Sequence, residues 1–299
     1  FLPQLQSPPQ FEKDRFFWGL LLMTLGLFEK VVLADTLFSG SADRVFGYAG
    51  PLMALESWTG VFAFAGQIFC DFAGYSTCAI GAALCLGFHL KDNFRFPYAA
   101  IGFSDFWRRW HISLSTFLRD YLYIPLGGNR RGPARAMLNL VIVMFLGGLW
   151  HGAAWTFVVW GLLHGSYLAI ERLLKALITP PRWIENFFAQ LAIGLVTYFA
   201  VLIAWVYFRA ANFETASRMI AGMFGQHAQS DAILSTREIL QVALVTVGLL
   251  IAHWSMRDTS IEAVAVRAPR WAVGTAWFLM AAAIILTQGS SNAFIYFQF

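Results

Sequence analysis

Charged residues are scarce in this sequence, and their scarcity already excludes a large class of proteins. Asp, Glu, Lys and Arg make up 13% of the 299 residues, whereas hydrophobic residues make up 58%. A water-soluble domain has about a quarter of its residues charged, so the composition excludes an ordinary soluble domain. We therefore expect a polytopic membrane protein whose surroundings are lipid.

Cysteine is rare as well, with Cys70, Cys78 and Cys85 spaced by eight and seven residues. This spacing places the thiols on one face of one helix, where they do not readily pair, so they are expected to be small apolar packing residues. No set of convergent metal ligands is evident, and we expect no metal and no permanently bound cofactor. Lys and Arg exceed Asp and Glu by only 21 to 17, an excess typical of cytoplasmic loops and anionic head groups, so no nucleic-acid partner is expected.

The sequence also lacks an initiator methionine and a signal peptide at Phe1. We therefore expect amino-terminal sequence to be missing, and we treat residues 1–299 as a single membrane-embedded domain.

Several apolar windows reach the twenty or so residues that a membrane-spanning helix needs. None of them alternates as a β-barrel strand does, so the predicted fold class is all-α. Residues 71–74 predict a break within the longest window, which exceeds one span. The windows are residues 16–38, 58–88, 137–149, 150–170, 187–208, 239–254 and 271–287.

Two stretches do not fit simple spanning helices. Residues 103–132 mix charges with aromatic rings, which predicts re-entrant structure buried in protein or lining a cavity. Residues 212–225 predict a short amphipathic helix lying on the membrane surface, with Asn212 as its N-cap.

Histidine 151 lies in FLGGLWHGAAW, residues 145–155, a run apolar enough to lie inside a membrane. An ionisable ring at such a place is costly and often functional, although a lone buried histidine bonded to a neighbouring carbonyl is about as common. His111 favours the functional interpretation, because it places a second imidazole beside Arg108, Arg109 and Trp110. Two such rings with arginines predict a reaction on an anionic substrate.

The other histidines are expected to lie outside this site. In a continuous helix His164 would follow His151 by thirteen residues and point to roughly the opposite face. His89, His227 and His253 lie near predicted span ends or loops and are expected to be interfacial.

The order of these motifs resembles the membrane-bound O-acyltransferase family, and most of all its bacterial alginate O-acetyltransferase branch. The segments that carry the resemblance are DFAGYSTCAIGAALCLGF, DFWRRWHISLSTFLRDYLYIPLGGNRRG, LGGLWHGAAWTFVVWG and WVYFRA, between about Gln67 and Ala210. Thr77 departs from the pattern, which has an acidic residue after GYS. The resemblance implies a helical bundle with re-entrant and interfacial helices around a central tunnel, in the bacterial inner membrane. It also implies that the family's amino-terminal helices are missing from this sequence.

The resemblance also implies the site and the reaction. His151 corresponds to the catalytic histidine of the family and His111 to its second signature position. Acetyl would pass from cytoplasmic acetyl-CoA towards hydroxyls of an exported polysaccharide such as alginate, with help from an extracytoplasmic partner protein. We expect substrate to contact Trp107, Arg108, Arg109, Trp110, Arg119, Trp150 and Trp155.

This chemistry agrees with the residue types. An alcohol is a poor nucleophile and needs a base, which a neutral imidazole shielded from water can supply. Candidate donors to the developing oxyanion are His111, the Trp110 indole and backbone N–H groups, and the arginines could bind donor phosphates.

Two alternatives remain open at this point. Within the family, the protein could transfer D-alanine to teichoic acid. In a different class, it could be a transporter in which His111 and His151 relay protons, although the two related halves common in transporters are not evident.

Overall fold

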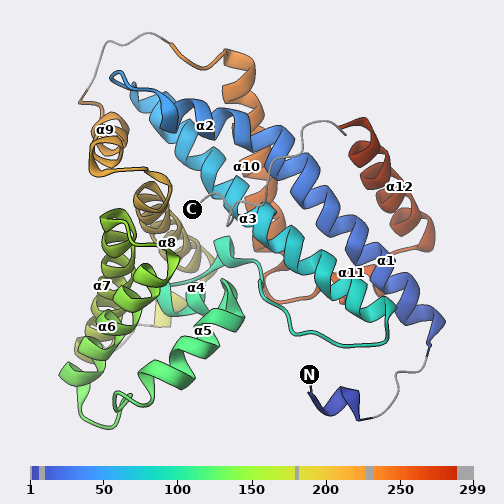
Figure 1. The fold of residues 1–299 in the computed structure, drawn as a ribbon, viewed down its shortest axis with the longest axis horizontal. Coiled ribbons are helices and arrows are strands. Elements are labelled where there is room, and N and C mark those ends of the chain that lie inside the picture. The colour runs from blue at the N-terminus through green and yellow to red at the C-terminus, as the bar shows by residue number, and fades with distance from the viewer. Residues whose placement is uncertain (1, 7–10, 179–181, 227–231, 288–299) are drawn as a thin grey trace.

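The computed structural model describes residues 2–6, 11–178, 182–226 and 232–287, and within these ranges the chain forms helices without a β-strand (Figure 1). The predicted all-α class is confirmed. Among the described residues, five helical segments are long and apolar enough to cross a membrane, so the chain is a multi-pass membrane protein. They are Lys13–Gly47, α3 (Ala54–Cys85), α6 (Pro133–His151), α8 (Phe187–Arg209) and α10 (Thr236–Met256).

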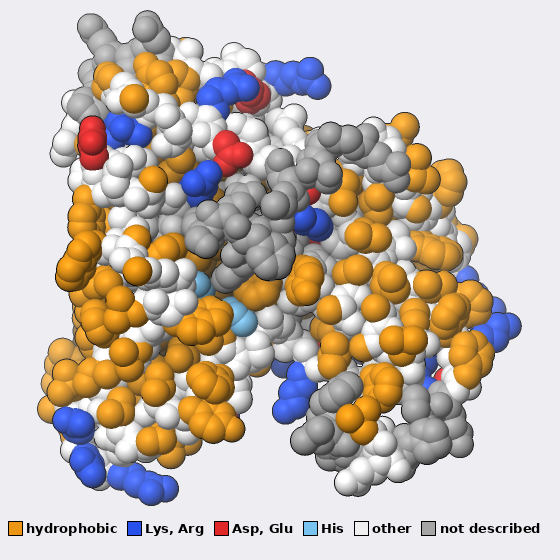
Figure 2. Space-filling model, in the orientation of Figure 1, with side chains coloured by type: hydrophobic (Ala, Val, Ile, Leu, Met, Phe, Trp, Pro, Cys, Tyr) orange, Lys and Arg blue, Asp and Glu red, His pale blue; other side chains and the backbone are white. Residues whose placement is uncertain are grey.

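The remaining helices connect or flank these segments. They are α4 (Phe103–Arg109), α5 (Ile112–Leu118), α7 (Trp155–Leu177), α9 (Phe213–Met223), α11 (Ile261–Arg267) and α12 (Arg270–Leu286), with short 3-10 turns at Leu2–Leu5, Pro97–Ala99 and Arg182–Glu185 and a π-helical turn at Arg119–Tyr123. In the face shown in Figure 2, hydrophobic side chains cover broad areas and charged groups form small separate clusters, as expected for lipid-facing surface.

The membrane-spanning segment Lys13–Gly47 consists of α1 (Lys13–Leu27), the π-helical stretch Phe28–Phe38 and α2 (Ser39–Gly47). It packs along α3. Glycines allow close contact, since a Cβ on Gly26 would lie 2.4 Å from the carbonyl oxygen of Gly74. The charges within this segment face protein, because Lys30 pairs with Asp35 at 2.8 Å and with Asp71 at 2.5 Å. The predicted break at residues 71–74 is wrong: α3 is continuous there, since the Lys30 ion pair accommodates Asp71 and the glycine contact accommodates Gly74.

Helices α6 and α7 form a tight hairpin at one side of the molecule (Figure 1). A Cβ on Gly148 would lie 2.3 Å from the carbonyl oxygen of Phe157, and one on Gly161 2.3 Å from that of Met144. Small residues at such positions let membrane helices approach closely. The hairpin turns at residues 152–154, so the two predicted windows 137–149 and 150–170 are two helices, with the division three to four residues later than predicted.

The amphipathic segment at 212–225 folds as α9, capped as predicted by Asn212, whose side chain accepts a hydrogen bond from the Thr215 N–H at 2.8 Å. Part of its apolar stripe packs against the protein. Ala216 and Met219 are fully buried, and Gly222 fits against Ser57 and the carbonyl oxygen of Leu52 beside α3. Phe213, at the start of the stripe, is 47% exposed, so the stripe docks α9 on α3 and leaves its first ring outside.

Substituting the hairpin glycines tests this packing. Gly148→Ala and Gly161→Ala are each expected to destabilise the folded protein by roughly 1–3 kcal/mol, because the new methyl group collides with backbone that cannot move away. The measurement is the thermal unfolding midpoint of the detergent-solubilised protein. Gly248→Ala is the matched control, since a Cβ there meets nothing within 4 Å; equal midpoints for all three variants would contradict the packing described.

Candidate active site

His151 is the last residue of α6, directly before the break that separates α6 from α7. Its ring is partly exposed and is contacted by aromatic rings from three helices. The ring centroids of Trp160 and Phe208 each lie 5.0 Å from that of His151, and the centroid of Trp150 lies 5.1 Å away. The imidazole is therefore held between apolar walls at a helix end while one side remains open.

His111 lies at the turn between α4 and α5 in the left-handed conformation, with φ of 43°. Its Nδ1 lies 3.2 Å from Oδ1 of Asn93, and the Ser113 hydroxyl donates to the same oxygen at 2.9 Å. Since an amide oxygen only accepts, we assign the proton to Nδ1 of His111. That tautomer leaves Nε2 as an acceptor.

Backbone hydrogen bonds hold the turn at His111 in place. Ile112 donates to the carbonyl of Asn93 at 2.9 Å, and Arg95 donates to the carbonyl of Arg109 at 2.9 Å. Phe72 packs edge-on against the imidazole at 4.7 Å. Asn93 is a site residue that the sequence analysis missed, and its position in a polar loop carries no signal that would have identified it.

The two predicted catalytic histidines are brought together. The buried indoles of Trp110, Trp205 and Trp160 lie between them, with centroid separations of 4.9 Å between Trp110 and Trp205 and 6.2 Å between Trp160 and Trp205. A continuous aromatic layer thus links the segments that carry the two histidines.

The predicted substrate-contacting tryptophans divide into two groups. Trp107 and Trp110 are buried, and Trp107 lies 5.9 Å from Trp160. Trp150 and Trp155 are 60% and 73% exposed, so their rings stand at the open side of the hairpin turn. Trp150 contacts His151, whereas Trp155 leaves most of its ring outside.

The predicted arginines differ in their surroundings. The guanidinium group of Arg109 is engaged within the protein, because it pairs with Asp105 at 2.9 Å and donates to the carbonyls of Arg95 and Arg257. Arg119 is exposed and pairs with the adjacent Asp120 at 2.8 Å. Arg108 is exposed.

The prediction that His164 points away from the site is wrong. The argument assumed one continuous helix, but the chain breaks after His151, and α7 folds back along α6. Both rings consequently contact Trp160, His151 at 5.0 Å and His164 at 4.9 Å. His164 is fully buried beside the site.

The prediction for His253 is also wrong, because this residue is buried and its Nδ1 accepts a hydrogen bond from the backbone N–H of Tyr98 at 3.2 Å. His89 is exposed, in keeping with the prediction. His227 lies outside the described residues.

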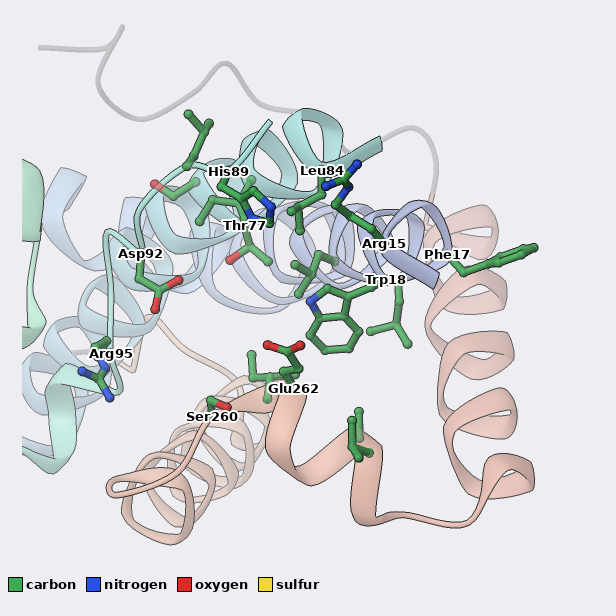
Figure 3. Close-up of a pocket in the computed structure, with 18 of the residues that line it drawn as sticks. Arg15, Phe17, Trp18, Thr77, Leu84, His89, Asp92, Arg95, Ser260 and Glu262 are labelled. Carbon is green, nitrogen blue, oxygen red and sulfur yellow. The ribbon is translucent and has the colours of Figure 1, made fainter. Parts of the chain in front are cut away.

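A cavity of about 820 Å³ opens between the start of α1, the end of α3 and α11. Figure 3 shows Trp18 and Glu262 approaching it from α1 and α11, with Thr77 and His89 on another wall. Asn93 and Phe94 line it as well, and both also contact His111. The cavity therefore extends from the surface to the residues that support His111.

Within the described part of the chain, no group of three or more His, Cys, Asp or Glu side chains is placed to hold a metal ion.

The titration of His111 gives a test of its burial. Desolvation lowers the pKa of His111 from the ordinary value of 6.5 to about 4. Because the folded-state pKa is depressed, the stabilisation from keeping this ring neutral is complete above pH 6.5 and is lost as pH falls towards 4.

His111→Asn removes this titration while tolerating the left-handed backbone. Between pH 6.5 and pH 4, wild-type protein is expected to lose up to roughly 3 kcal/mol more of its unfolding free energy than the variant, at about 1.4 kcal/mol per pKa unit. Thermal unfolding at several pH values measures the difference; parallel curves for the two proteins would show that His111 is not desolvated.

Comparison with known proteins agrees with the family resemblance found in the sequence. The family model for the membrane-bound O-acyltransferase family matches residues 17–217. The chain is 42% identical over 253 residues to the "Probable alginate O-acetylase" of Azotobacter vinelandii, covering 82% of this chain and 48% of that protein. It is 42% identical over 217 residues to the peptidoglycan O-acetyltransferase of Helicobacter pylori, covering 73% and 40%.

A more distant similarity is to the teichoic acid D-alanyltransferase of Streptococcus thermophilus, at 31% identity over 161 residues, covering 49% of this chain and 38% of that protein. The chain spans about half the length of the alginate relatives that it matches. The predicted resemblance is confirmed: this chain belongs to the membrane-bound O-acyltransferase family.

Proposed function

We propose that the protein is an O-acetyltransferase that moves an acetyl group from cytoplasmic acetyl-CoA towards hydroxyls of an exported polysaccharide, with His151 as the general base. The observation that carries this proposal is the position of His151 at the open end of α6, walled by Trp160 and Phe208. A partly shielded imidazole beside an opening can meet a hydroxyl and take its proton.

The reaction needs two proton transfers through His151 and the exchange of one carbon–sulfur bond for one carbon–oxygen bond. The acceptor hydroxyl gives its proton to a ring nitrogen of His151 while its oxygen bonds to the acyl carbon. The carbon–sulfur bond of the thioester then breaks, and the proton passes from the imidazolium to the leaving thiolate. His111 contributes a second imidazole, which Asn93 fixes through Nδ1 and whose unprotonated Nε2 can accept a hydrogen bond.

The acyl donor carries several phosphate charges, which favours an exposed basic surface for its docking. The turn before α6 offers such a surface, because Arg130 and Arg131 are exposed. Asn139 fixes this turn by donating to the carbonyls of Leu126 and Gly128. We therefore place the phosphates of acetyl-CoA at this turn.

The 820 Å³ cavity is a weaker candidate for the same phosphates. Its lining includes the guanidinium groups of Arg15 and Arg95, but also the four carboxylates of Glu12, Asp14, Asp92 and Glu262. A polyanion is not favoured there. The cavity better suits an uncharged or zwitterionic group that reaches towards His111 from the surface.

The acceptor side of the proposal depends on the relatives. Proteins named for alginate and peptidoglycan O-acetylation match most of this chain at 42% identity, which supports a polysaccharide acceptor outside the cytoplasm. We place the protein in the bacterial inner membrane, with an extracytoplasmic partner that completes transfer. D-alanyl transfer to teichoic acid is less favoured, because the relative named for it matches only 49% of the chain.

The central test is His151→Ala in the complete protein. We expect loss of polysaccharide acetylation and at least a hundredfold slower release of coenzyme A from acetyl-CoA in membranes with acceptor present. Immunoblotting of membranes confirms that the variant accumulates. Undiminished acetylation would contradict the enzyme proposal, and lost transport with intact acetylation would favour the transporter alternative.

A second test addresses donor binding. The double variant Arg130→Ala, Arg131→Ala is expected to raise the KM for acetyl-CoA about tenfold or more with little change in kcat, because it removes phosphate contacts far from the reacting atoms. Arg237→Ala, an equally exposed arginine at the start of α10, is the matched control. An unchanged KM in the double variant would place the donor elsewhere.

A further inference from the structure

His164 is a buried polar side chain that the proposed reaction leaves without a role. Its exposure is 0%, and neither Nδ1 nor Nε2 has a hydrogen-bond partner within the described structure. An imidazole always carries at least one N–H donor. Because buried polar groups are nearly always hydrogen-bonded, each exception calls for an explanation such as a ligand.

Two neighbouring indoles also have N–H groups without a hydrogen-bond acceptor. Trp107 of α4 and Trp160 of α7 are both buried, and the Nε1–H of each lacks an acceptor. The ring centroids of the three residues lie close to one another: His164 is 5.1 Å from Trp107 and 4.9 Å from Trp160, and the two indoles are 5.9 Å apart. We call these three residues the His164 triad.

The chemistry of the triad selects its ligand. An indole nitrogen donates and never accepts, so two of the three groups can be satisfied only by an acceptor atom. Phe106 stacks on His164 at 5.9 Å and Tyr167 packs edge-on at the same distance. These aromatic rings shield the His164 imidazole from water. An oxygen that gains negative charge is the ligand such shielded donors stabilise most.

The triad lies directly beside the proposed base. Trp160 contacts both imidazoles, with its ring centroid 5.0 Å from that of His151 and 4.9 Å from that of His164. One member of the triad therefore touches the proposed base directly.

We propose that His164, Trp107 and Trp160 form an oxyanion pocket that receives the carbonyl oxygen of the acyl thioester. This inference rests on the proposed function. As the acceptor oxygen bonds to the acyl carbon, its proton moves to His151 and the carbonyl π electrons move onto the oxygen held by the triad. When the carbon–sulfur bond breaks, those electrons re-form the carbonyl, and the thiolate takes the proton back from His151.

A buried water molecule could supply the same acceptor oxygen, and its presence would give the triad a purely structural role. The two sources predict different results for His164→Phe, which keeps an aromatic ring and removes both nitrogens. If no water is bound there, the thermal unfolding midpoint should be unchanged or higher, because the two unpartnered nitrogens of His164 are no longer buried. If a buried water is bonded to His164, the midpoint should fall, because that water loses a partner. Only the oxyanion pocket predicts a loss of catalysis.

The experiment compares kcat and the KM for acetyl-CoA in the complete protein, in membranes with acceptor. For His164→Phe we expect kcat to fall about a hundredfold with KM within about twofold of wild type. Trp107→Phe removes a second donor and should show the same pattern, which keeps the test valid if His164→Phe does not fold. A stable His164→Phe protein with kcat within about twofold of wild type overturns the proposal in favour of water.

His253→Phe is the matched control, because it makes the same change at a buried histidine whose Nδ1 already has a partner in the Tyr98 N–H. We expect it to lower the unfolding midpoint while kcat of the folded protein stays within a few-fold. A kcat loss as large as that of His164→Phe would count against a specific role for the triad.

The His151→Ala variant separates the two levels of the proposal. If His151→Ala abolishes transfer while His164→Phe does not, only the oxyanion pocket fails. If neither variant affects transfer, the proposed reaction itself fails.

Discussion

The close contact between α6 and α7 is the interaction on which the candidate site depends. Gly148 and Gly161 allow the two backbones to meet, with no room for a Cβ on either residue. Since the hydrophobic effect does not drive helix association within lipid, such close packing holds membrane helices together. The contact fixes where the chain turns, and the turn leaves His151 at a helix end with one side open.

The second requirement is a frame that brings a distant segment to this hairpin. Asp105 binds both Arg109 and Arg257, and thereby ties α4 to the end of α10. The loop at Asn93 holds the turn between α4 and α5 through the His111 ring and the backbone of Ile112. His111 consequently reaches the aromatic layer around His151 from a segment forty residues earlier in the chain.

Most of the helices and both histidines could be predicted from the sequence, because long apolar windows and the FLGGLWHGAAW motif are local signals. Helical periodicity assumes an unbroken helix, however, and that assumption misplaced His164, which the turn after His151 returns to the site. The prediction of a break at residues 71–74 was wrong in the opposite sense, because it assumed a helix end where the helix continues. An acidic residue and a glycine in an apolar window look like a helix end, whereas Lys30 and Gly26 on another helix accommodate them.

Asn93 could not be found from the sequence, since its role follows from a contact across eighteen residues with nothing local to mark it. The apolar stripe of α9 was recognised, but sequence alone does not say whether such a stripe faces lipid or protein. Contacts with Leu52 and Ser57 decide it here. Tertiary contacts between segments, which leave no local pattern, account for each of these gaps.

The most direct measurement of the central claim is a structure of the complete protein with a non-transferable acyl-CoA analogue bound. The account predicts the acyl carbon within about 4 Å of a ring nitrogen of His151, the spacing of a near-attack geometry. An acyl group bound elsewhere, with His151 facing lipid or sealed behind Trp160 and Phe208, would contradict it.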